Sequence, residues 1–416
     1  MSRTKDRTIN LLFLIFLFYG ISATIISPII PLLSERLKIG YDKIGLILLV
    51  GSIFALLSTF ITGRFCDRFN LKKIILTGII LSIIGFLLFT IYLNILIFIF
   101  VIIFLRLGQS ILDSSVHAYG ARIFYRNHSL IFMKLDIFWY IGAIIGPLLM
   151  SIVLFIKINI KIIFIILGFF YIIMLIYFYI TSPNNELGLV NSNKIQFSGT
   201  TLSSGSYNLN NNIRLKLNTF SILKNPIIVI ACIVLFFYMN IMACLSSWLT
   251  TYFTSLNIPI TSGSVILSFF WAFSALGLFL NMKIAEKGKG NDVSLLFACM
   301  ILGTLSTFIY SFVPIIYVKI IFLMFQAVFY SLIFPLSLSI AVGEDMKKTG
   351  EIIGVSMSSG GVASIIFQPF MGYMIEYFGK ASIAYILVVT SMLELIMVLA
   401  LFKLVQNKYR IRFKIY

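Results

Sequence analysis

The segment Gly63-Arg-Phe-Cys-Asp67-Arg68-Phe-Asn-Leu-Lys72-Lys73 joins two long apolar stretches of the chain. Each stretch has the roughly 20 apolar residues that a membrane-spanning helix needs. So short a link indicates that two helices turn back at one membrane surface, and we expect Gly63 to mark their close approach. Arg68, Lys72 and Lys73 are placed to face anionic headgroups, whereas Asp67 can cap or pair with a neighbouring helix end.

The composition is that of an integral membrane protein. Of the 416 residues, 60% are hydrophobic and 11% are charged, whereas soluble proteins carry roughly 25% charged residues. Alternating segments of strand length do not occur, which argues against a transmembrane barrel. We therefore predict an all-α membrane protein with twelve transmembrane helices, approximately 9–34, 43–64, 73–93, 95–124, 131–155, 161–181, 226–252, 261–284, 293–313, 316–343, 351–377 and 380–403.

The net charge of +18 would suggest a nucleic-acid partner in a soluble protein. Here most of the 32 basic residues fall in segments that twelve spans place on the same side as the N-terminus. The positive-inside rule then predicts a multi-pass protein of the cell membrane with both termini cytoplasmic. The bilayer, not nucleic acid, is the expected partner.

The longest polar stretch divides the chain into two halves. It is rich in Asn, Ser and Gly and cannot bury a core, so we predict a flexible cytoplasmic linker. An acid–base pair follows both the second and the eighth span, which indicates a weak internal repeat. The predicted units are a six-helix bundle over 1–181, the linker over 182–224, and a six-helix bundle with a short basic tail over 225–416.

The opening segment resembles the loop motif between the second and third helices of the major facilitator superfamily, G-x-x-x-D-R-x-x-x-[RK]-[RK]. The resemblance implies two six-helix pseudo-repeats and transport of a small-molecule solute by alternating access. The stretch Gly142-Ala-Ile-Ile-Gly146-Pro147 is similar to the superfamily's fifth-helix motif, which is prominent among drug–proton antiporters. The alternative interpretation of that stretch is close packing by small residues with a proline kink.

Within the fourth span, polar side chains recur at steps of four, three and four residues: Arg106, Ser110, Asp113 and His117. They share one helix face. A charge at a helix centre costs about 2.5–3.5 kcal/mol on insertion scales, and marks a pathway or relay. Asp113 lies about 10.5 Å from Arg106 along the axis, so Ser110 or water would have to bridge them. We predict that Asp113 carries the coupling proton, while Arg106 limits the cost of its charge. His117 passes protons on or bonds a solute hydroxyl. A buried structural acid is the alternative for Asp113.

The same helix resembles the fourth helix of the fucose–galactose–hexose proton symporter family, in which an acid is followed four positions on by an Asn. Here the acid is Asp113, and His117 replaces the Asn. The first-helix acid that characterised fucose carriers use is missing. The resemblance implies a sugar-like solute, with a proton (or sodium) as the coupling ion.

Polar and aromatic side chains of the second half suit a cavity for a neutral polyhydroxylated solute, because aromatic faces stack on sugar rings. The candidate solute ligands are Tyr238, Asn240, Trp248, Gln326, Tyr330 and Gln368, with Ser110 from the fourth span. Each also suits helix packing. Two further acids lie within spans: we expect Asp136 to cap the inner end of its helix, and Glu394 to pack with a polar partner.

The leading hypothesis is proton-coupled uptake of a sugar-like solute by a monomer. An efflux antiporter for drugs or metabolites is the second, favoured by the 41 Phe and the fifth-helix motif. The third is a transporter-like sensor without flux. An enzyme is not expected, because no nucleophile–base pair, metal cluster or phosphate loop occurs. No cofactor or metal is expected, since the four cysteines have no metal-ligand spacing and are read as small core residues.

Overall fold

The computed structural model describes residues 2–91, 94–123, 128–182, 222–286, 292–345 and 349–414. Within these ranges the regular structure is helical, and 12 helical segments are long and apolar enough to cross a membrane. The predicted all-α fold class with twelve spans is confirmed. Most of the predicted linker lies outside the described residues.

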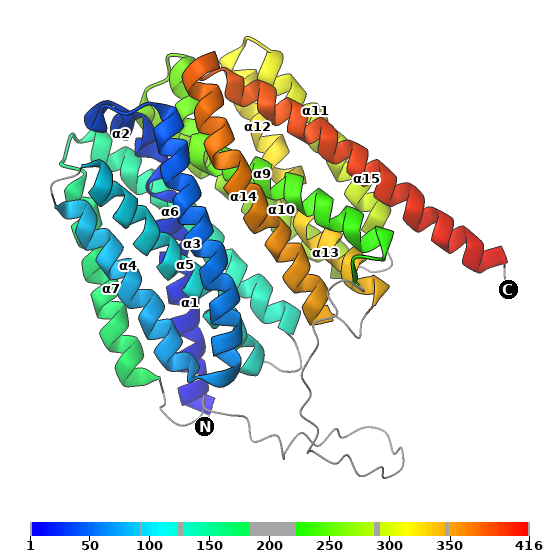
Figure 1. The fold of residues 1–416 in the computed structure, drawn as a ribbon, viewed down its shortest axis with the longest axis horizontal. Coiled ribbons are helices and arrows are strands. Elements are labelled where there is room, and N and C mark those ends of the chain that lie inside the picture. Colours follow the sequence, from blue (N-terminus) through cyan, green and yellow to red (C-terminus); the bar gives the residue numbers. More distant parts are fainter. Residues whose placement is uncertain are drawn as a thin grey trace.

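The first six spans are long helices joined by short turns (Figure 1). In chain order they are α1 (Ser2–Thr24), continued through η1 (Ser27–Ile29) by α2 (Ile30–Leu37), then α3 (Tyr41–Arg68), α4 (Leu71–Thr90), α5 (Ile95–Ile123), α6 (His128–Phe155) and α7 (Lys161–Thr181). Pro28 and Pro31 stand at the starts of η1 and α2. Because proline has no N–H to donate, the first span is broken there.

The last six spans follow the same plan. They are α9 (Pro226–Ser255), α10 (Ile260–Glu286), α11 (Asp292–Phe312), α12 (Ile316–Tyr330) with α13 (Ile333–Glu344), α14 (Thr349–Phe378) and α15 (Ser382–Lys414). We expected the tenth span to be one helix, but it is divided into α12 and α13. Pro335 lies in the first turn of α13 and cannot donate to the carbonyl of Ser331, which explains the break.

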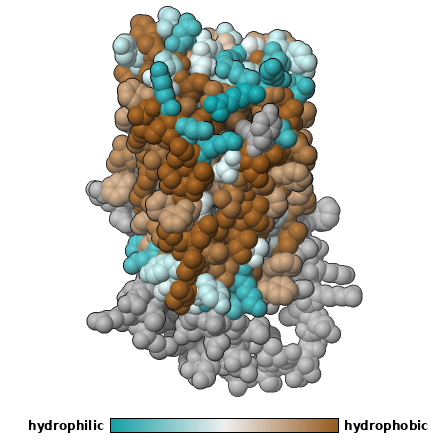
Figure 2. Space-filling model, turned by 90° about the vertical axis from the view of Figure 1, so that its left-hand side faces the viewer, coloured by the Kyte–Doolittle hydropathy of each residue, from teal (hydrophilic) through white to brown (hydrophobic). Residues whose placement is uncertain are grey.

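A broad apolar band crosses the face of the molecule that Figure 2 shows. The surface exposes bulky side chains that would be buried in a soluble protein, such as Phe169, Ile176 and Phe308, which are 60%, 53% and 44% exposed. The helices satisfy their own backbone hydrogen bonds, as spanning segments must in a solvent that offers none. The chain is therefore a multi-pass membrane protein.

The two halves meet at one end of the bundle. We call the end where α1 begins and α7 ends the terminal face, and the end where α2 ends and α3 begins the opposite face (Figure 1). Near the opposite face a Cβ added to Gly45 of α3 would lie 3.1 Å from the Cα of Gly372 on α14. The hydroxyl of Ser151 on α6 donates to the carbonyl of Thr261 on α10 at 2.9 Å.

Toward the terminal face α3 and α14 diverge (Figure 1). Gly63 of α3, Gly343 of α13 and Gly354 of α14 lie toward that face, and a Cβ added to any of them would meet no atom within 4 Å. The expectation that Gly63 marks a close helix approach is therefore wrong for this conformation. In the described part of the chain, the halves are closed at the opposite face and apart at the terminal face.

Candidate functional site

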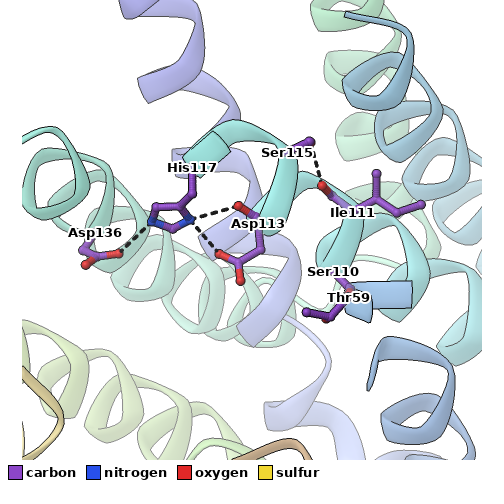
Figure 3. A network of polar contacts seen from close by, with 7 residues as sticks. All are labelled: Thr59, Ser110, Ile111, Asp113, Ser115, His117 and Asp136. Atoms are coloured by element: carbon purple, nitrogen blue, oxygen red, sulfur yellow. Dashed lines mark hydrogen bonds and ion pairs between the residues drawn. The ribbon is translucent and has the colours of Figure 1, made fainter. Parts of the chain in front are cut away.

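Asp113, His117 and Asp136 form one polar cluster between α5 and α6 (Figure 3). Nδ1 of His117 lies 3.3 Å from Oδ1 and 2.9 Å from the backbone oxygen of Asp113. Its Nε2 lies 3.8 Å from Oδ1 of Asp136. Both ring nitrogens thus face acceptors, which suits an imidazolium with two N–H donors. Asp113 and His117, which we predicted to share one helix face, are in contact. Asp136 reaches the same imidazole instead of only capping its helix.

The cluster is accessible although it lies within spans. The side chains of His117, Asp113 and Asp136 are 28%, 36% and 49% exposed. The ring of Phe16 on α1 packs edge-on against the imidazole, with centroids 4.9 Å apart. Since the halves are apart at the terminal face, protons can reach this cluster from that face.

Ser110 does not connect Arg106 to Asp113. Its hydroxyl donates to the carbonyl of Ala55 at 2.8 Å and lies 2.7 Å from Oγ1 of Thr59 (Figure 3). These contacts fasten α5 to α3, because a hydroxyl in a membrane helix is satisfied by its neighbours where no water is present. The two charges of α5 are therefore held apart, with no ion pair between them.

Arg106 lines a small cavity between the halves. The cavity has a volume of about 30 Å³ and is walled by Ser22 of α1, Arg106 and Gln109 of α5, and Ser247 of α9, with aliphatic side chains around them. The Gln109 amide donates to the hydroxyl of Ser22 at 3.4 Å. Gln109 and Ser22 were not predicted as site residues, and only their place beside Arg106 reveals them.

An aromatic layer crosses the boundary between the halves. The rings of Trp139 on α6 and Trp271 on α10 are perpendicular, with centroids 5.2 Å apart. Tyr19 packs on Trp139 at 6.1 Å, and Tyr140 on Trp271 at 6.1 Å. Sequence reasoning missed this layer. The chain has only 3 Trp, and two of them meet here.

Two predicted solute ligands bond each other instead of lining an open cavity. Nε1 of Trp248 donates to Oε1 of Gln368 at 3.0 Å, and the Gln368 amide donates to the hydroxyl of Ser247 at 3.2 Å. The indole is fully buried and packs at 6.2 Å from the ring of Tyr41 on α3. This series of contacts links the closed opposite face to the Arg106 cavity through Ser247.

The other four predicted ligands of the second half are inside the helix bundle: Tyr238 and Asn240 on α9, Gln326 and Tyr330 on α12. All are at most 6% exposed. Glu394 on α15 is fully buried, and neither of its carboxyl oxygens has a hydrogen-bond partner among the described residues. In this conformation the structure does not bring these side chains to the Arg106 cavity, so their contact with solute stays a prediction.

The segment Gly63–Lys73 is only partly described. The side chains of Asp67 and Arg68 lie outside the described residues. Lys72, which we expected to face headgroups, is buried and donates to the carbonyl of Ser182 at the end of α7. Lys73 is exposed. The Lys72 ammonium favours that carbonyl because the end of a helix carries partial negative charge.

The fifth-helix stretch packs against α1. A Cβ added to Gly142 would lie 2.9 Å from the backbone N of Ile21, and one added to Gly146 would lie 2.9 Å from the carbonyl oxygen of the same residue. Gly20 of α1 faces Gly142 in return. Pro147 lies inside α6. The stretch therefore provides close packing between these helices, and a further role in conformational change stays a prediction.

Among the described residues, no three His, Cys, Asp or Glu side chains converge as a metal site does. The cysteines are buried and unpaired by disulfides. Within the described ranges, the site offers the guanidinium of Arg106, a cluster of two carboxyls and an imidazole, and hydroxyl, amide and aromatic groups.

A match over most of the sequence shows the family to which the chain belongs. The family model of the Major Facilitator Superfamily matches residues 12–344. The chain belongs to the Major Facilitator Superfamily. The membership indicates a transporter of small-molecule solutes and not an enzyme. Among curated proteins, none matches the sequence. The narrower resemblance of α5 to the fucose–galactose–hexose symporter family stays a prediction.

Solved transporter structures share the fold. A POT family transporter in complex with a thioalcohol-conjugated peptide superposes with a TM-score of 0.75 at 15% identity, covering 96% of each chain. The nucleoside transporter NupG gives 0.74 at 15% identity, over 96% of this chain and 100% of that one. A bacterial homologue of the human lysosomal transporter Spinster gives 0.73 at 11% identity, over 97% of each. At these identities the likeness concerns the fold.

Proposed function

We propose that this superfamily member takes up a small, polar, sugar-like solute together with protons by alternating access. The observation that carries the proposal is the accessible cluster of Asp113, His117 and Asp136, set in a membrane span on the open side of a molecule whose opposite face is closed. An ionisable group at membrane depth marks an ion or proton pathway by default. Sodium as the coupling ion remains the alternative.

The orientation follows from the basic residues. With both termini in the cytoplasm, the terminal face is cytoplasmic, and this conformation faces inward. Asp113 would then receive a proton when the opposite face is open and release it to the cytoplasm in the conformation seen here. His117 holds Asp113 from one side and Asp136 from the other, so it can pass the proton between them.

The solute would bind between the halves, above the proton cluster. The amide of Gln109 and the hydroxyl of Ser247 supply hydrogen bonds there, and the rings of Trp139 and Trp271 supply faces for a sugar-like ring. Opening of the opposite face would part α3 from α14 and uncover the Trp248–Gln368 pair. We propose that these two residues contact solute in that state.

The test is transport by purified protein in proteoliposomes. We expect Asp113→Asn to retain counterflow of labelled solute and to lose concentrative uptake driven by a proton gradient, because counterflow needs no net proton movement. Asp136→Asn should slow uptake without abolishing it, since its contact with His117 is the longer one at 3.8 Å. Concentrative uptake by Asp113→Asn at the native proton stoichiometry would refute the role of Asp113.

Efflux is the second candidate, and the aromatic layer between the halves favours it because aromatic walls suit apolar solutes. Vesicles loaded with an apolar dye distinguish efflux from solute uptake. Dye export driven by an inward proton gradient, without sugar counterflow, would establish an antiporter. Solute binding without any flux would establish the transporter-like sensor.

A further inference from the structure

Arg106 presents a charge that no described residue neutralises. Its aliphatic stem packs on α3, where a Cβ added to Gly51 would lie 3.0 Å from Cγ of Arg106. Arg106 lines the cavity between the halves, and its guanidinium has no hydrogen bond or ion pair with any described residue. Arginine stays protonated in proteins and brings five N–H donors. A membrane protein that keeps such a group unpaired keeps it for a ligand.

The acids nearest in sequence are used elsewhere. Asp113 contacts His117, and the hydroxyl of Ser110, which we expected to bridge Arg106 and Asp113, is bonded to α3. No acidic residue lines the cavity.

The rest of the cavity wall is mostly aliphatic, but polar side chains in it keep free donors. The hydroxyl of Ser22 accepts from Gln109 and from Tyr171 and donates to the carbonyl of Tyr19, so its bonding capacity is used. The amide of Gln109 keeps a second N–H. The hydroxyl of Ser247 accepts from Gln368 and keeps its own proton to donate. A cavity with one positive charge, free donors on Gln109 and Ser247 and no acidic residue in its lining is complementary to an anion.

The shape of the arginine side chain and the size of the cavity limit which anions can bind. The planar fork of an arginine matches the two oxygens of a carboxylate. A volume of about 30 Å³ accommodates roughly two water molecules, which is the size of one carboxylate group. One cation balances one negative charge.

We propose that Arg106, with Gln109 and Ser247, binds the carboxylate of the transported solute, so that the substrate class is a hydroxylated monocarboxylate and not a neutral sugar. That this solute is transported rests on the proposed function. The binding of a carboxylate at Arg106 does not depend on it. Since Arg106 comes from the first half and Ser247 from the second, the bound carboxylate joins the halves. One proton carried with one carboxylate would make uptake electroneutral.

The test measures binding by the purified full-length protein in lipid nanodiscs. Gluconate, lactate and acetate are compared with sorbitol and propanediol, with sodium chloride matching the ionic strength, and the readouts are the thermal unfolding temperature and the dissociation constant. We expect at least one of the three carboxylates to stabilise the wild type and the neutral polyols not to do so. In Arg106→Gln, binding should weaken at least about tenfold, since hydrogen bonds to a charged group are lost.

Two further variants serve as controls. Arg106→Lys keeps the charge without the fork, so it should fold as the wild type does and bind more weakly than the wild type. Lys157→Gln removes an exposed cation far from the cavity and should leave binding unchanged. Equal stabilisation by gluconate and sorbitol, unchanged binding in both Arg106 variants, or no stabilisation by any of the carboxylates would overturn the proposal. Binding through Arg106 without flux in proteoliposomes would refute transport and leave the carboxylate site standing.

Discussion

The backbone N–H of Tyr41, in the first turn of α3, donates a hydrogen bond of 2.7 Å to Oε2 of Glu376 on α14. The helix needs this acceptor because Gly40, at its N-cap position, has no side chain to cap it. Negative charge at a helix N-terminus is also favoured by the helix dipole. A residue of the second half therefore caps a helix of the first, and the cap exists only while the opposite face is closed.

Removal of this cap should open the opposite face. An N-cap is worth about 0.5–2 kcal/mol, so Glu376→Ala should shift the population toward the open form severalfold, and Glu376→Gln, which keeps an acceptor, should shift it less. Distances between spin labels at the starts of α7 and α15 report the shift. Glu35→Ala is the control, because Glu35 is an exposed acid of the same face whose side chain bonds no described residue. An equal shift in the control would show that the cap is not responsible.

The contact between Gly45 and Gly372 should also favour the closed form of the opposite face. A methyl group at Gly372 would collide with the backbone of α3, and overpacking costs about 1–3 kcal/mol. Gly372→Ala should therefore disfavour the closed form about 5–150-fold, seen as faster maleimide labelling of a cysteine placed at Ser27 in a background without native cysteines. Gly354→Ala, on the same helix but beside open space, should label as the parent does. Unchanged labelling in Gly372→Ala would contradict the packing argument.

Most of the fold could be predicted because hydropathy is averaged over a whole span, so single polar residues do not hide it. The contact of Asp113 with His117 could also be predicted, since a separation of four residues brings two side chains together on any helix. The break of the tenth span could have been predicted from Pro335. These features are local in the sequence, and local spacing determines them.

The remainder of the site depends on contacts between helices far apart in the sequence. Asp136 meets His117, Thr59 meets Ser110, and Trp139 meets Trp271 only after the helices pack. Sequence spacing also cannot tell whether a polar side chain in a span faces a cavity or another helix, because both satisfy its hydrogen bonds. Trp248 was therefore expected to line a cavity, whereas it bonds Gln368.

Glu394 tests the cost of a buried carboxyl. Both its oxygens lack a hydrogen bond with the described residues, and so does the hydroxyl of Tyr330. Glu394→Met should raise the free energy of unfolding by about 1–3 kcal/mol, because an unsatisfied buried polar group is removed. Glu394→Gln keeps a polar group and should gain nothing. Thermal unfolding in detergent measures both, and lower stability of Glu394→Met with loss of uptake would show that the acid is needed.

Lys72 and Lys73 are adjacent members of one family motif, yet the structure gives them different tasks. The Lys72 ammonium is buried, donates to the carbonyl of Ser182 and lies 5.1 Å from the ring centroid of Tyr179. Lys72→Met should lower the free energy of unfolding by about 1.5–3 kcal/mol, as loss of a charged hydrogen bond does. Lys73→Met removes the same charge from an exposed position and should leave unfolding unchanged. Thermal unfolding of the two variants measures this difference in stability. If the two variants are equally stable, Lys72 does not hold the end of α7. Its place in the motif would then concern conformational change alone.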